Sequence, residues 1–362
     1  MTPLDRLIRR LITQDGPMPV SLYMTLALQH PRYGYYRQAA PIGLAGDFVT
    51  APEVSQVFGE LIGLWMATVW AGAQRPGNSI MCEAGPGRGV LLSDALRAIR
   101  QALPDFEAST TLHLVESSET LRAQQAEALS PLAPTWHDSV EDLPEGPLFL
   151  IANEFLDALP VTQFIYTADG WRERMIGLDA ENQLLFIPGT APATSAAANG
   201  LGLPNEAAVG DIHEVQPGVL SFVREIATRI AQHHGAALLI DYGENSPFGH
   251  STLRGIRSHR IINPLTNAGD SDLTVDVDFR AVRQVARSAG AIVQGPVGMG
   301  PFLHALGVET RRTALTKVAD AKRAAVVDQA IDRLLDPDRM GKIFKVLAIA
   351  APSSGSLPGF SS

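Results

Sequence analysis

One short segment of the sequence combines an acidic residue with three closely spaced glycines. Glu83 follows the mostly apolar residues 79–82, and Gly85, Gly87 and Gly89 come soon after it. Glycine lets the backbone bend sharply and approach a ligand with no Cβ in the way. The helix predicted from residue 91 onward would also point its free N–H groups at the same place. The segment therefore predicts a strand, a turn and a helix that together bind a nucleotide-like cofactor.

Charge and spacing decide between the candidate cofactors. The dinucleotide fingerprint G-x-G-x-x-G/A would need glycine or alanine at position 90, where the sequence has Val90. Glu83 would repel a pyrophosphate, whereas it would attract the ammonium group of S-adenosylmethionine (SAM). Glu116, at the end of the next apolar stretch, can accept hydrogen bonds from the ribose diol. We therefore expect SAM as the cofactor, bound by Glu83, Gly85, Pro86, Gly87, Gly89 and Glu116.

The elements that position these residues follow from alternating apolar and helical patterns. Candidate strands lie at residues 79–82, 111–115, 148–152 and 236–240, with helical patterns between them. This alternation predicts a doubly wound, Rossmann-like α/β fold, in which helices cover both faces of a parallel sheet. Ligands of such folds bind beyond the carboxyl ends of the strands, so the glycine-rich turn is expected at that edge.

Composition divides the rest of the chain into a helical start, a core and a tail. Residues 1–77 are predicted to form a helical N-terminal portion or lid, residues 78–350 the core with insertions near 163–235 and 245–310, and residues 351–362 a disordered tail. Within the core, residues 189–210 indicate a surface loop and residues 313–335 a long helix. Candidate strands at 291–294 and 343–350 flank that helix.

Polar residues at the ends of two strands are the candidate catalytic and substrate-binding groups. Asn153, Glu154 and Asp157 follow one buried strand, and Asp241 and Tyr242 end another. A pair of carboxylates can hold a guanidinium through bidentate hydrogen bonds and orient its nitrogen toward a methyl donor. We therefore expect Glu154 and Asp157 to hold a cationic substrate beside Asn153, in a pocket that the second strand end lines. Capping of the following turn by Asn153 and Asp157 is an alternative that the sequence leaves open.

The segment 46–60 carries a second pair of acidic residues, Asp47 and Glu53. Glycines and a proline around them fix the backbone, so the segment can act as a lid that contributes both carboxylates to the substrate pocket. Thr50 and Glu53 also have the Thr-x-x-Glu spacing of a capping box, with a helix starting near Ser55. The sequence favours neither interpretation over the other.

Charge and hydropathy exclude two classes of partner. The formal charge of −9 and the lack of a basic stripe argue against nucleic acid, while an acidic protein suits a cationic substrate. The nearest basic cluster, Arg254, Arg257 and Arg260, is expected on a solvated loop. No apolar stretch reaches the length of about 18 residues that a membrane span needs.

The cysteine and aspartate patterns exclude a disulfide and a metal site. Cys82 is the only cysteine, which rules out an intrachain disulfide and suits a reducing compartment. Asp272, Asp276 and Asp278 lack the ligand spacing of a calcium loop. They predict instead a helix start before Phe279, so we expect no metal site.

Several motifs occur in an order that identifies a family. Alongside segments 46–60 and 83–89, these are residues 153–160, 241–243, 272–274, 302–303 and 340–347. From about residue 4 to residue 348, the chain resembles the MidA family of SAM-dependent methyltransferases. The resemblance implies a class I SAM-methyltransferase fold that ends in an antiparallel strand pair. It also implies methylation of an arginine on a protein substrate, a subunit of respiratory complex I (NADH dehydrogenase), during assembly of the complex.

The resemblance has two weak points and leaves two alternatives. The chain has Val275 and Asp276 where the family pattern has a small residue and a histidine, and residues 295–300 match loosely. A role that depends on a histidine there is therefore not expected. The resemblance implies the cytoplasm for a bacterial member and the mitochondrial matrix for eukaryotic relatives. The alternatives are a dinucleotide oxidoreductase, which would tolerate Glu83→Gln, and a non-catalytic assembly factor that uses the SAM fold as a docking surface.

Overall fold

A mostly parallel sheet of eight strands organises the part of the chain that carries the glycine-rich turn. The computed structural model describes residues 1–37, 50–192, 202–204, 206–244 and 249–360. The strand order is β15–β16–β10–β5–β2–β3–β4, with β14 paired to β10. The strands are β2 (Ser79–Ala84), β3 (Thr110–Val115), β4 (Thr135–His137), β5 (Leu148–Asn153), β10 (Gly235–Glu244), β14 (Val277–Asp278), β15 (Ile292–Gly298) and β16 (Phe344–Ala350). Only β16 runs in the opposite direction to the other strands, so the predicted Rossmann-like fold and its antiparallel strand pair are confirmed.

Helices cover both faces of this sheet because its strands alternate apolar side chains between the two faces. In β10, Leu238 and Ile240 point into one apolar core, and Ala237 and Leu239 point into the other. The first core includes side chains of α4 (Gln56–Gly72), α5 (Val90–Ala102) and α6 (Pro104–Ala108). The second includes side chains of α9 (Pro217–His233) and α10 (Phe279–Ser288). Apolar side chains on both faces are what a buried parallel sheet requires.

Two glycines bring α4 unusually close to α5. A Cβ built on Gly63 would lie 2.6 Å from the Cα of Ala95, and one built on Gly59 would lie 2.8 Å from the carbonyl oxygen of Leu91. Because α5 starts directly after the glycine-rich turn, this close packing fixes the turn relative to α4.

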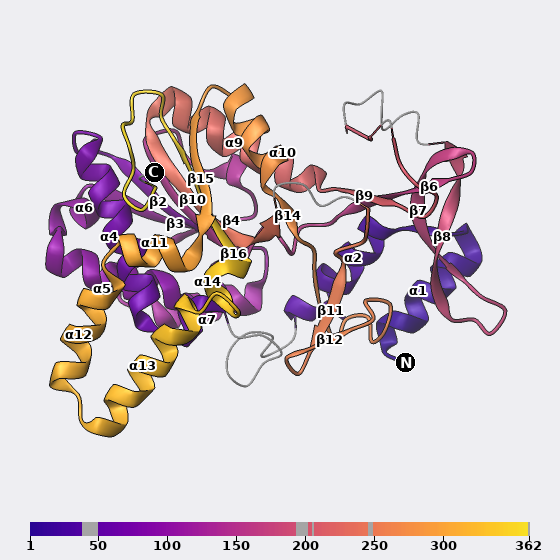
Figure 1. The fold of residues 1–362 in the computed structure, drawn as a ribbon, viewed down its shortest axis with the longest axis horizontal. Coiled ribbons are helices and arrows are strands. Elements are labelled where there is room, and N and C mark those ends of the chain that lie inside the picture. Colours follow the sequence, from indigo (N-terminus) through magenta and orange to yellow (C-terminus); the bar gives the residue numbers. More distant parts are fainter. Residues whose placement is uncertain (38–49, 193–201, 205, 245–248, 361–362) are drawn as a thin grey trace.

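The N-terminal helices pack on a second body, on the right of Figure 1, and not on the main sheet. This body contains α1 (Pro3–Asp15), α2 (Val20–Gln29), β1 (Met18–Pro19), β6 (Thr162–Thr167), β7 (Gly170–Leu178), β8 (Leu184–Pro192), β9 (Ile212–Val215), β11 (Arg254–Arg257), β12 (Arg260–Ile262) and β13 (Asp272–Thr274). Its sheets have the orders β1–β7–β6–β9, with β8 on β7, and β12–β11–β13. Residues 1–77 are therefore not one unit, because α1 and α2 join the insertions while α4 joins the main sheet.

Four helices connect β15 to β16. They are α11 (Met299–Ala305), α12 (Val308–Val318), α13 (Ala321–Leu335) and α14 (Met340–Ile343). α12 and α13 form a hairpin that projects at the lower left of Figure 1. The prediction of a single helix over residues 313–335 is wrong, because the chain turns at Ala319 and Asp320 starts a new helix. The Asp320 carboxylate accepts a hydrogen bond from the Arg323 N–H at 2.8 Å, as an N-cap does.

The C-terminal segment also differs from its prediction. Residues 351–360 were expected in a disordered tail, yet they pack on the first core. The indole Nε1 of Trp65 donates a hydrogen bond to the carbonyl of Pro358 at 3.0 Å, and the rings of Phe302 and Phe360 lie 5.3 Å apart. Leu357 is buried. Polar composition predicts disorder, but it does not reveal that these few anchoring groups have partners.

The remaining short elements are η1 (Tyr35–Arg37), α3 (Ala51–Val54), α7 (Glu119–Ala128) and η2 (Val140–Asp142). Residues 193–201 and 205, which belong to the predicted surface loop at 189–210, lie outside the described residues. Among the helices of the described residues, none is long and apolar enough to cross a membrane.

Candidate functional site

The glycine-rich turn has the backbone conformation that its sequence predicts. Gly85, Gly87 and Gly89 have φ angles of 66°, 52° and 80°, a region that favours glycine. Gly89 caps the N-terminus of α5. A Cβ on Gly85 would lie only 2.7 Å from the Cδ2 atom of Phe155, so a side chain there would collide with the loop after β5. The turn therefore leaves backbone, and not side chains, facing the carboxyl edge of the sheet.

Two buried oxygen atoms beside this turn have no hydrogen-bond partner among the described residues. They are Oε2 of Glu83, whose residue is 3% exposed, and Oδ1 of Asn153, whose residue is 7% exposed. Both residues line a hollow of about 50 Å³ together with residues of the turn. Burial raises the pKa of Glu83 to about 8, although a backbone hydrogen bond from Leu92 opposes the shift. Unsatisfied buried acceptors are costly, so the pair is suited to a cationic N–H donor such as an ammonium group.

Glu116 lies at the end of β3 and is held by its neighbours. Its Oε1 accepts a hydrogen bond from the Ser118 N–H at 2.7 Å, and its Oε2 accepts one from Nε2 of Gln125 at 3.3 Å. The same Gln125 nitrogen donates to the carbonyl of Gly87 at 2.8 Å, so it links Glu116 to the glycine-rich turn. Burial raises the pKa of Glu116 above its ordinary value. Sequence reasoning missed Gln125, because a glutamine on an ordinary helix carries no local signal.

A cavity of about 280 Å³ opens between the main sheet and the second body. Its lining residues are Gln29, Tyr36, Arg37, Gly85, Gly87, Val115, Glu116, Ser117, Ser118, Leu121, Asp138, Glu154, Phe155, Ala158 and Leu159. The three N-terminal members were not predicted. The only signal for them in the sequence is the aromatic-rich segment 33–36, which is typical of a turn. The cavity places Glu116 and Glu154 on the walls of one space.

Glu154 has a strained backbone and a partly buried side chain. Its φ angle is 52°, in the left-handed region that few non-glycine residues adopt, and its N–H donates to the carbonyl of Ile240 at 2.9 Å. Oε1 accepts hydrogen bonds from the Ala51 N–H at 3.0 Å and from Nδ2 of Asn153 at 3.1 Å. The hydroxyl of Tyr242 lies 3.5 Å from Oε2. Burial raises the pKa of Glu154 to about 8.

Asp241 stabilises the loop after β5, and it lines neither the cavity of about 280 Å³ nor the hollow of about 50 Å³. It is fully buried, and its carboxyl oxygens accept hydrogen bonds from the N–H groups of Leu156, Asp157 and Tyr242 at 2.9, 3.2 and 2.9 Å. Burial and the nearby charge of Asp157 raise its pKa well above its ordinary value. Asp241 therefore holds the loop after β5 in place, whereas the sequence predicted a pocket-lining role.

Asp157 and Tyr242 contact residues of the three-stranded sheet. The hydroxyl of Thr274 donates a hydrogen bond to Asp157 at 2.6 Å, and burial raises the pKa of Asp157 to about 6. The guanidinium of Arg254 lies 5.6 Å from the centre of the Tyr242 ring and forms an ion pair with Asp276 at 2.7 Å. Arg254 therefore lies on β11 beside the candidate site, and its prediction as a residue of a solvated loop is wrong. At the position where a histidine was expected, Asp276 provides an acidic ion-pair partner.

The segment before α4 covers the glycine-rich turn. The carboxylate of Glu53 lies 3.6 Å from Nε of Arg88, and Thr50 and Glu53 both line the small hollow. The Thr50 side chain makes no capping hydrogen bond, so the predicted capping box is absent. Asp47 lies outside the described residues.

The helix start predicted before Phe279 is confirmed. Asp278 caps α10, with Oδ1 accepting hydrogen bonds from the N–H groups of Arg280 and Ala281 at 2.9 and 3.1 Å. In the part of the chain that the structure describes, no group of three or more His, Cys, Asp or Glu side chains could hold a metal ion.

Comparisons with known proteins agree on one kind of relative. A family model for S-adenosyl-L-methionine-dependent methyltransferases matches residues 61–297. The mitochondrial protein arginine methyltransferase NDUFAF7 of Danio rerio is 35% identical over 93% of this chain and 84% of its own length, and that of Homo sapiens is 33% identical over 96% and 83%. A crystal structure from Burkholderia thailandensis with bound S-adenosyl-homocysteine superposes with a TM-score of 0.81 at 27% identity, over 99% of this chain and 94% of that one. A native crystal structure from the same organism gives a TM-score of 0.83 at 29% identity.

Proposed function

Because the chain belongs to the MidA family of SAM-dependent methyltransferases, we propose that it transfers a methyl group from SAM to an arginine of a protein substrate. The relatives named above are called protein arginine methyltransferases, and one superposed structure holds S-adenosyl-homocysteine, which is SAM without its methyl group. When bound, SAM supplies an electrophilic methyl group on a positively charged sulfur. The chain itself must bind this donor, orient the acceptor and accept a proton.

The observation that carries the proposal is the pair of unpartnered oxygens on Glu83 and Asn153. Both are acceptors, both are buried, and both lie beside a glycine-rich turn, which suits the ammonium of the methionine part of SAM. Glu116, across the larger cavity, offers carboxylate oxygens to the ribose diol. Gly85, Pro86, Gly87 and Gly89 provide the close backbone approach between them.

Glu154 and Asp157 supply the acceptor chemistry in this proposal. A guanidinium is protonated in water, with a pKa above about 12, so its nitrogen becomes nucleophilic only as a proton leaves. Glu154, with its pKa raised to about 8, is a partly buried carboxyl suited to hold the guanidinium and to take up that proton. Glu154 would take up the proton that leaves the guanidinium, so the methylated product would keep a single positive charge and the Glu154 carboxyl would become neutral. Asp157, three residues after Glu154, adds a second negative charge. Asn153 positions the methyl donor and the guanidinium.

The protein partner in this proposal is a subunit of respiratory complex I (NADH dehydrogenase), as the family resemblance implies. The acidic chain suits a target that presents a cationic arginine. The buried lone Cys82 fits a reducing compartment, and the proposal places the protein in the cytoplasm.

Calorimetry with SAM and with NAD tests the cofactor first. Wild-type protein should bind SAM and not NAD, and Glu116→Ala should weaken SAM binding by about tenfold to a hundredfold, because the diol loses a charged acceptor worth roughly 1.5–3 kcal/mol. Binding of NAD would favour the oxidoreductase alternative. A folded wild type that binds a complex I subunit but not SAM would favour the non-catalytic assembly factor.

Substitution of Glu154 tests the chemistry. Glu154→Gln keeps the shape of the side chain but removes its negative charge, so methyl transfer to a complex I subunit should fall by at least about a hundredfold. Mass spectrometry of the subunit measures the transfer, and calorimetry should show SAM binding retained. The exposed Glu127→Gln on α7 is the matched control and should behave as wild type. Full methylation by Glu154→Gln would contradict the assigned role.

A further inference from the structure

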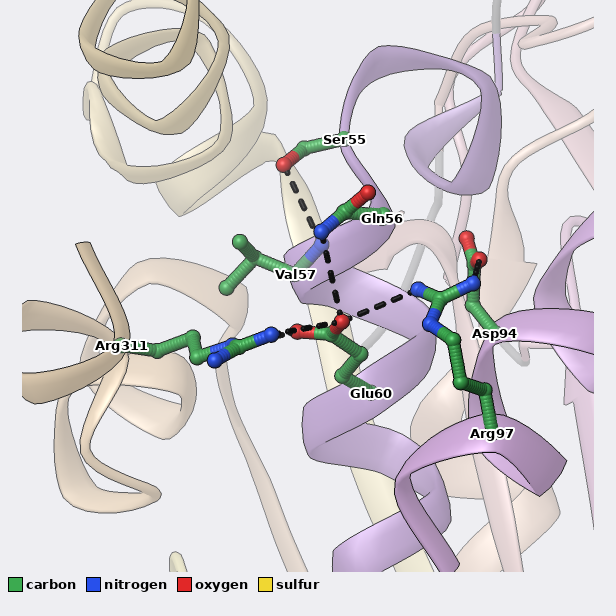
Figure 2. A network of polar contacts seen from close by, with 7 residues as sticks. All are labelled: Ser55, Gln56, Val57, Glu60, Asp94, Arg97 and Arg311. Atoms are coloured by element: carbon green, nitrogen blue, oxygen red, sulfur yellow. Dashed lines mark hydrogen bonds and ion pairs between the residues drawn. The ribbon is translucent and has the colours of Figure 1, made fainter. Parts of the chain in front are cut away.

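The segment 46–60 ends in a carboxylate that the proposed chemistry does not use. Glu60 lies on α4 and is only 3% exposed, and Figure 2 shows two guanidinium groups that approach it from opposite sides. Its Oε1 accepts hydrogen bonds from Nη2 of Arg97 at 2.9 Å and from Nη2 of Arg311 at 3.0 Å. Its Oε2 accepts a further one from Nε of Arg311 at 2.6 Å. Burial alone would raise the pKa of Glu60, but the two arginines outweigh it and the pKa lies below its ordinary value.

The two arginines come from different parts of the fold. Arg97 lies on α5, the helix that the glycine-rich turn begins, and it also pairs with Asp94 at 2.7 Å. Arg311 lies on α12, in the hairpin that projects from the main sheet. Glu60 therefore joins three helices at one point. Buried ion pairs contribute more to specific arrangement than to stability, because the cost of desolvation offsets much of their attraction.

The same network fixes the first turn of α4. Nε2 of Gln56, the first residue of the helix, lies 3.4 Å from Oε1 of Glu60 (Figure 2). Oγ of Ser55 caps the helix by accepting a hydrogen bond from the Val57 N–H at 3.3 Å. Ser55 is the only residue between α4 and α3, and its backbone is extended. The position of α3 therefore follows from the position of the first turn of α4.

α3 in turn contacts both halves of the candidate site. The Ala51 N–H donates to Oε1 of Glu154 at 3.0 Å. Glu53 pairs with Arg88 of the glycine-rich turn at 3.6 Å. α13 of the projecting hairpin also packs on α3, so the hairpin supports this short helix from a second side. A continuous set of contacts thus leads from Arg311 through Glu60 to Glu154.

We infer that Glu60 is a positioning residue of the site: through Arg311 and Arg97 it holds α3 in place, and with α3 the Ala51 N–H that orients Glu154. The inference rests on the proposed function, because Glu154 matters for SAM and substrate only if the chain is the methyltransferase proposed above. It assigns the projecting α12–α13 hairpin a role in completing the site, although the hairpin itself contributes no lining residue to either hollow.

The test compares two neighbouring arginines of α12. Arg311→Met removes the contact with Glu60, and the side chain is 39% exposed, so its truncation should be tolerated. Arg312→Met is the matched control, because Arg312 pairs with Glu309 and Asp332 within the hairpin and not with Glu60. Hydrogen exchange of the ligand-free proteins, measured by mass spectrometry, should show faster exchange at residues 51–54 in Arg311→Met only. Because α3 also holds Arg88 of the glycine-rich turn through Glu53, calorimetry should show SAM binding weakened roughly fivefold or more in Arg311→Met and unchanged in Arg312→Met.

Two further variants and a pH series separate positioning from mere stability. Glu60→Gln should reproduce Arg311→Met, and Arg311→Lys, which keeps the charge, should recover part of the SAM affinity. Loss of the Ala51 donor should also raise the pKa of Glu154 and so shift the pH profile of methyl transfer upward in Arg311→Met, whereas a general loss of stability would lower the melting temperature without such a shift. Equal hydrogen exchange at residues 51–54 in Arg311→Met and Arg312→Met would overturn the inference. Faster exchange in Arg311→Met with an unchanged affinity for SAM would also overturn it. A wild type that fails to bind SAM would overturn the proposed function instead, while the exchange comparison would still decide whether Glu60 holds α3.

Discussion

In the proposed site, the buried carboxyl of Glu83 faces the ammonium group of SAM, and SAM binding should therefore depend on pH. In the ligand-free protein its pKa is raised to about 8 by burial, so at neutral pH most molecules carry a neutral carboxylic acid there. An ammonium group beside it favours the carboxylate, and binding therefore lowers this pKa and releases a proton. Affinity should rise as the pH rises toward 8, by at most about tenfold per pH unit. Above about pH 8 the amino group of SAM loses its own proton, and the affinity should fall again.

Calorimetry between about pH 6 and pH 9, in buffers of different ionisation enthalpy, measures both the affinity and the released protons. Glu83→Gln cannot ionise, so most of the rise below pH 8 and part of the proton release should disappear in this variant. An affinity for SAM that stays constant across this range in wild type would show that Glu83 does not face the ammonium.

At the same scale, the sequence predicts which residues reach the edge of the sheet but not how each one is used. Glu83, Glu116 and Glu154 lie where strand ends place them, because strand position is a local property. Asp241 lies at the same edge, yet its oxygens are occupied by three backbone N–H groups. The left-handed backbone of Glu154 likewise has no sequence signal, because it depends on contacts with Ile240 and Ala51.

At the scale of elements, the close crossing of α4 and α5 holds the glycine-rich turn in place. Gly63→Ala would place a Cβ 2.6 Å from the Cα of Ala95 and 2.7 Å from its carbonyl oxygen, so the helices would have to separate. We expect a loss of about 1–3 kcal/mol in the free energy of unfolding, together with weaker SAM binding. Gly72→Ala at the end of the same helix meets no atom within 4 Å and should be neutral or stabilising by up to about 1 kcal/mol.

Denaturant unfolding of the two alanine variants measures the difference, and calorimetry measures its effect on SAM. Equal stability of Gly63→Ala and Gly72→Ala would mean that α4 and α5 can adjust without cost, which would contradict the close packing. A large loss of stability with unchanged SAM affinity would show instead that the crossing supports the fold but not the turn.

Element types were predictable from local patterns, whereas their ends and connections were not. The four parallel strands were placed correctly because their apolar runs are continuous and each is followed by polar residues. The helix expected at residues 313–335 is divided because Asp320 caps a new helix, a signal that a strong helical pattern on both sides hides. Thr50 and Glu53 have the spacing of a capping box, but Glu53 pairs with Arg88 instead.

At the scale of the whole molecule, the second body could not be predicted because its contacts join distant parts of the sequence. Met18 pairs with Ile176 in the five-stranded sheet. The hydroxyl of Thr2 donates to the carbonyl of Ala268, and that of Tyr23 to the carbonyl of Pro264, both at 2.7 Å. No local pattern carries such pairings. For this reason the sequence also missed the N-terminal side of the cavity, where Tyr36 lies.

Because the cavity has walls from both bodies, SAM should stabilise both of them. η1 carries Tyr36, whose hydroxyl donates to Asp272 at 3.2 Å and whose carbonyl accepts a hydrogen bond from Ser118 at 2.9 Å, so it connects the second body to the loop after β3. A ligand that binds only the folded form at a concentration of 100 times its Kd adds about 2.7 kcal/mol to stability. Hydrogen exchange should therefore slow in α2 and η1 as well as in β2 and α5 when SAM is added, and NAD should slow none of them. Protection confined to β2 and α5 would mean that the second body takes no part in holding SAM, and that its wall of the cavity serves the protein substrate alone.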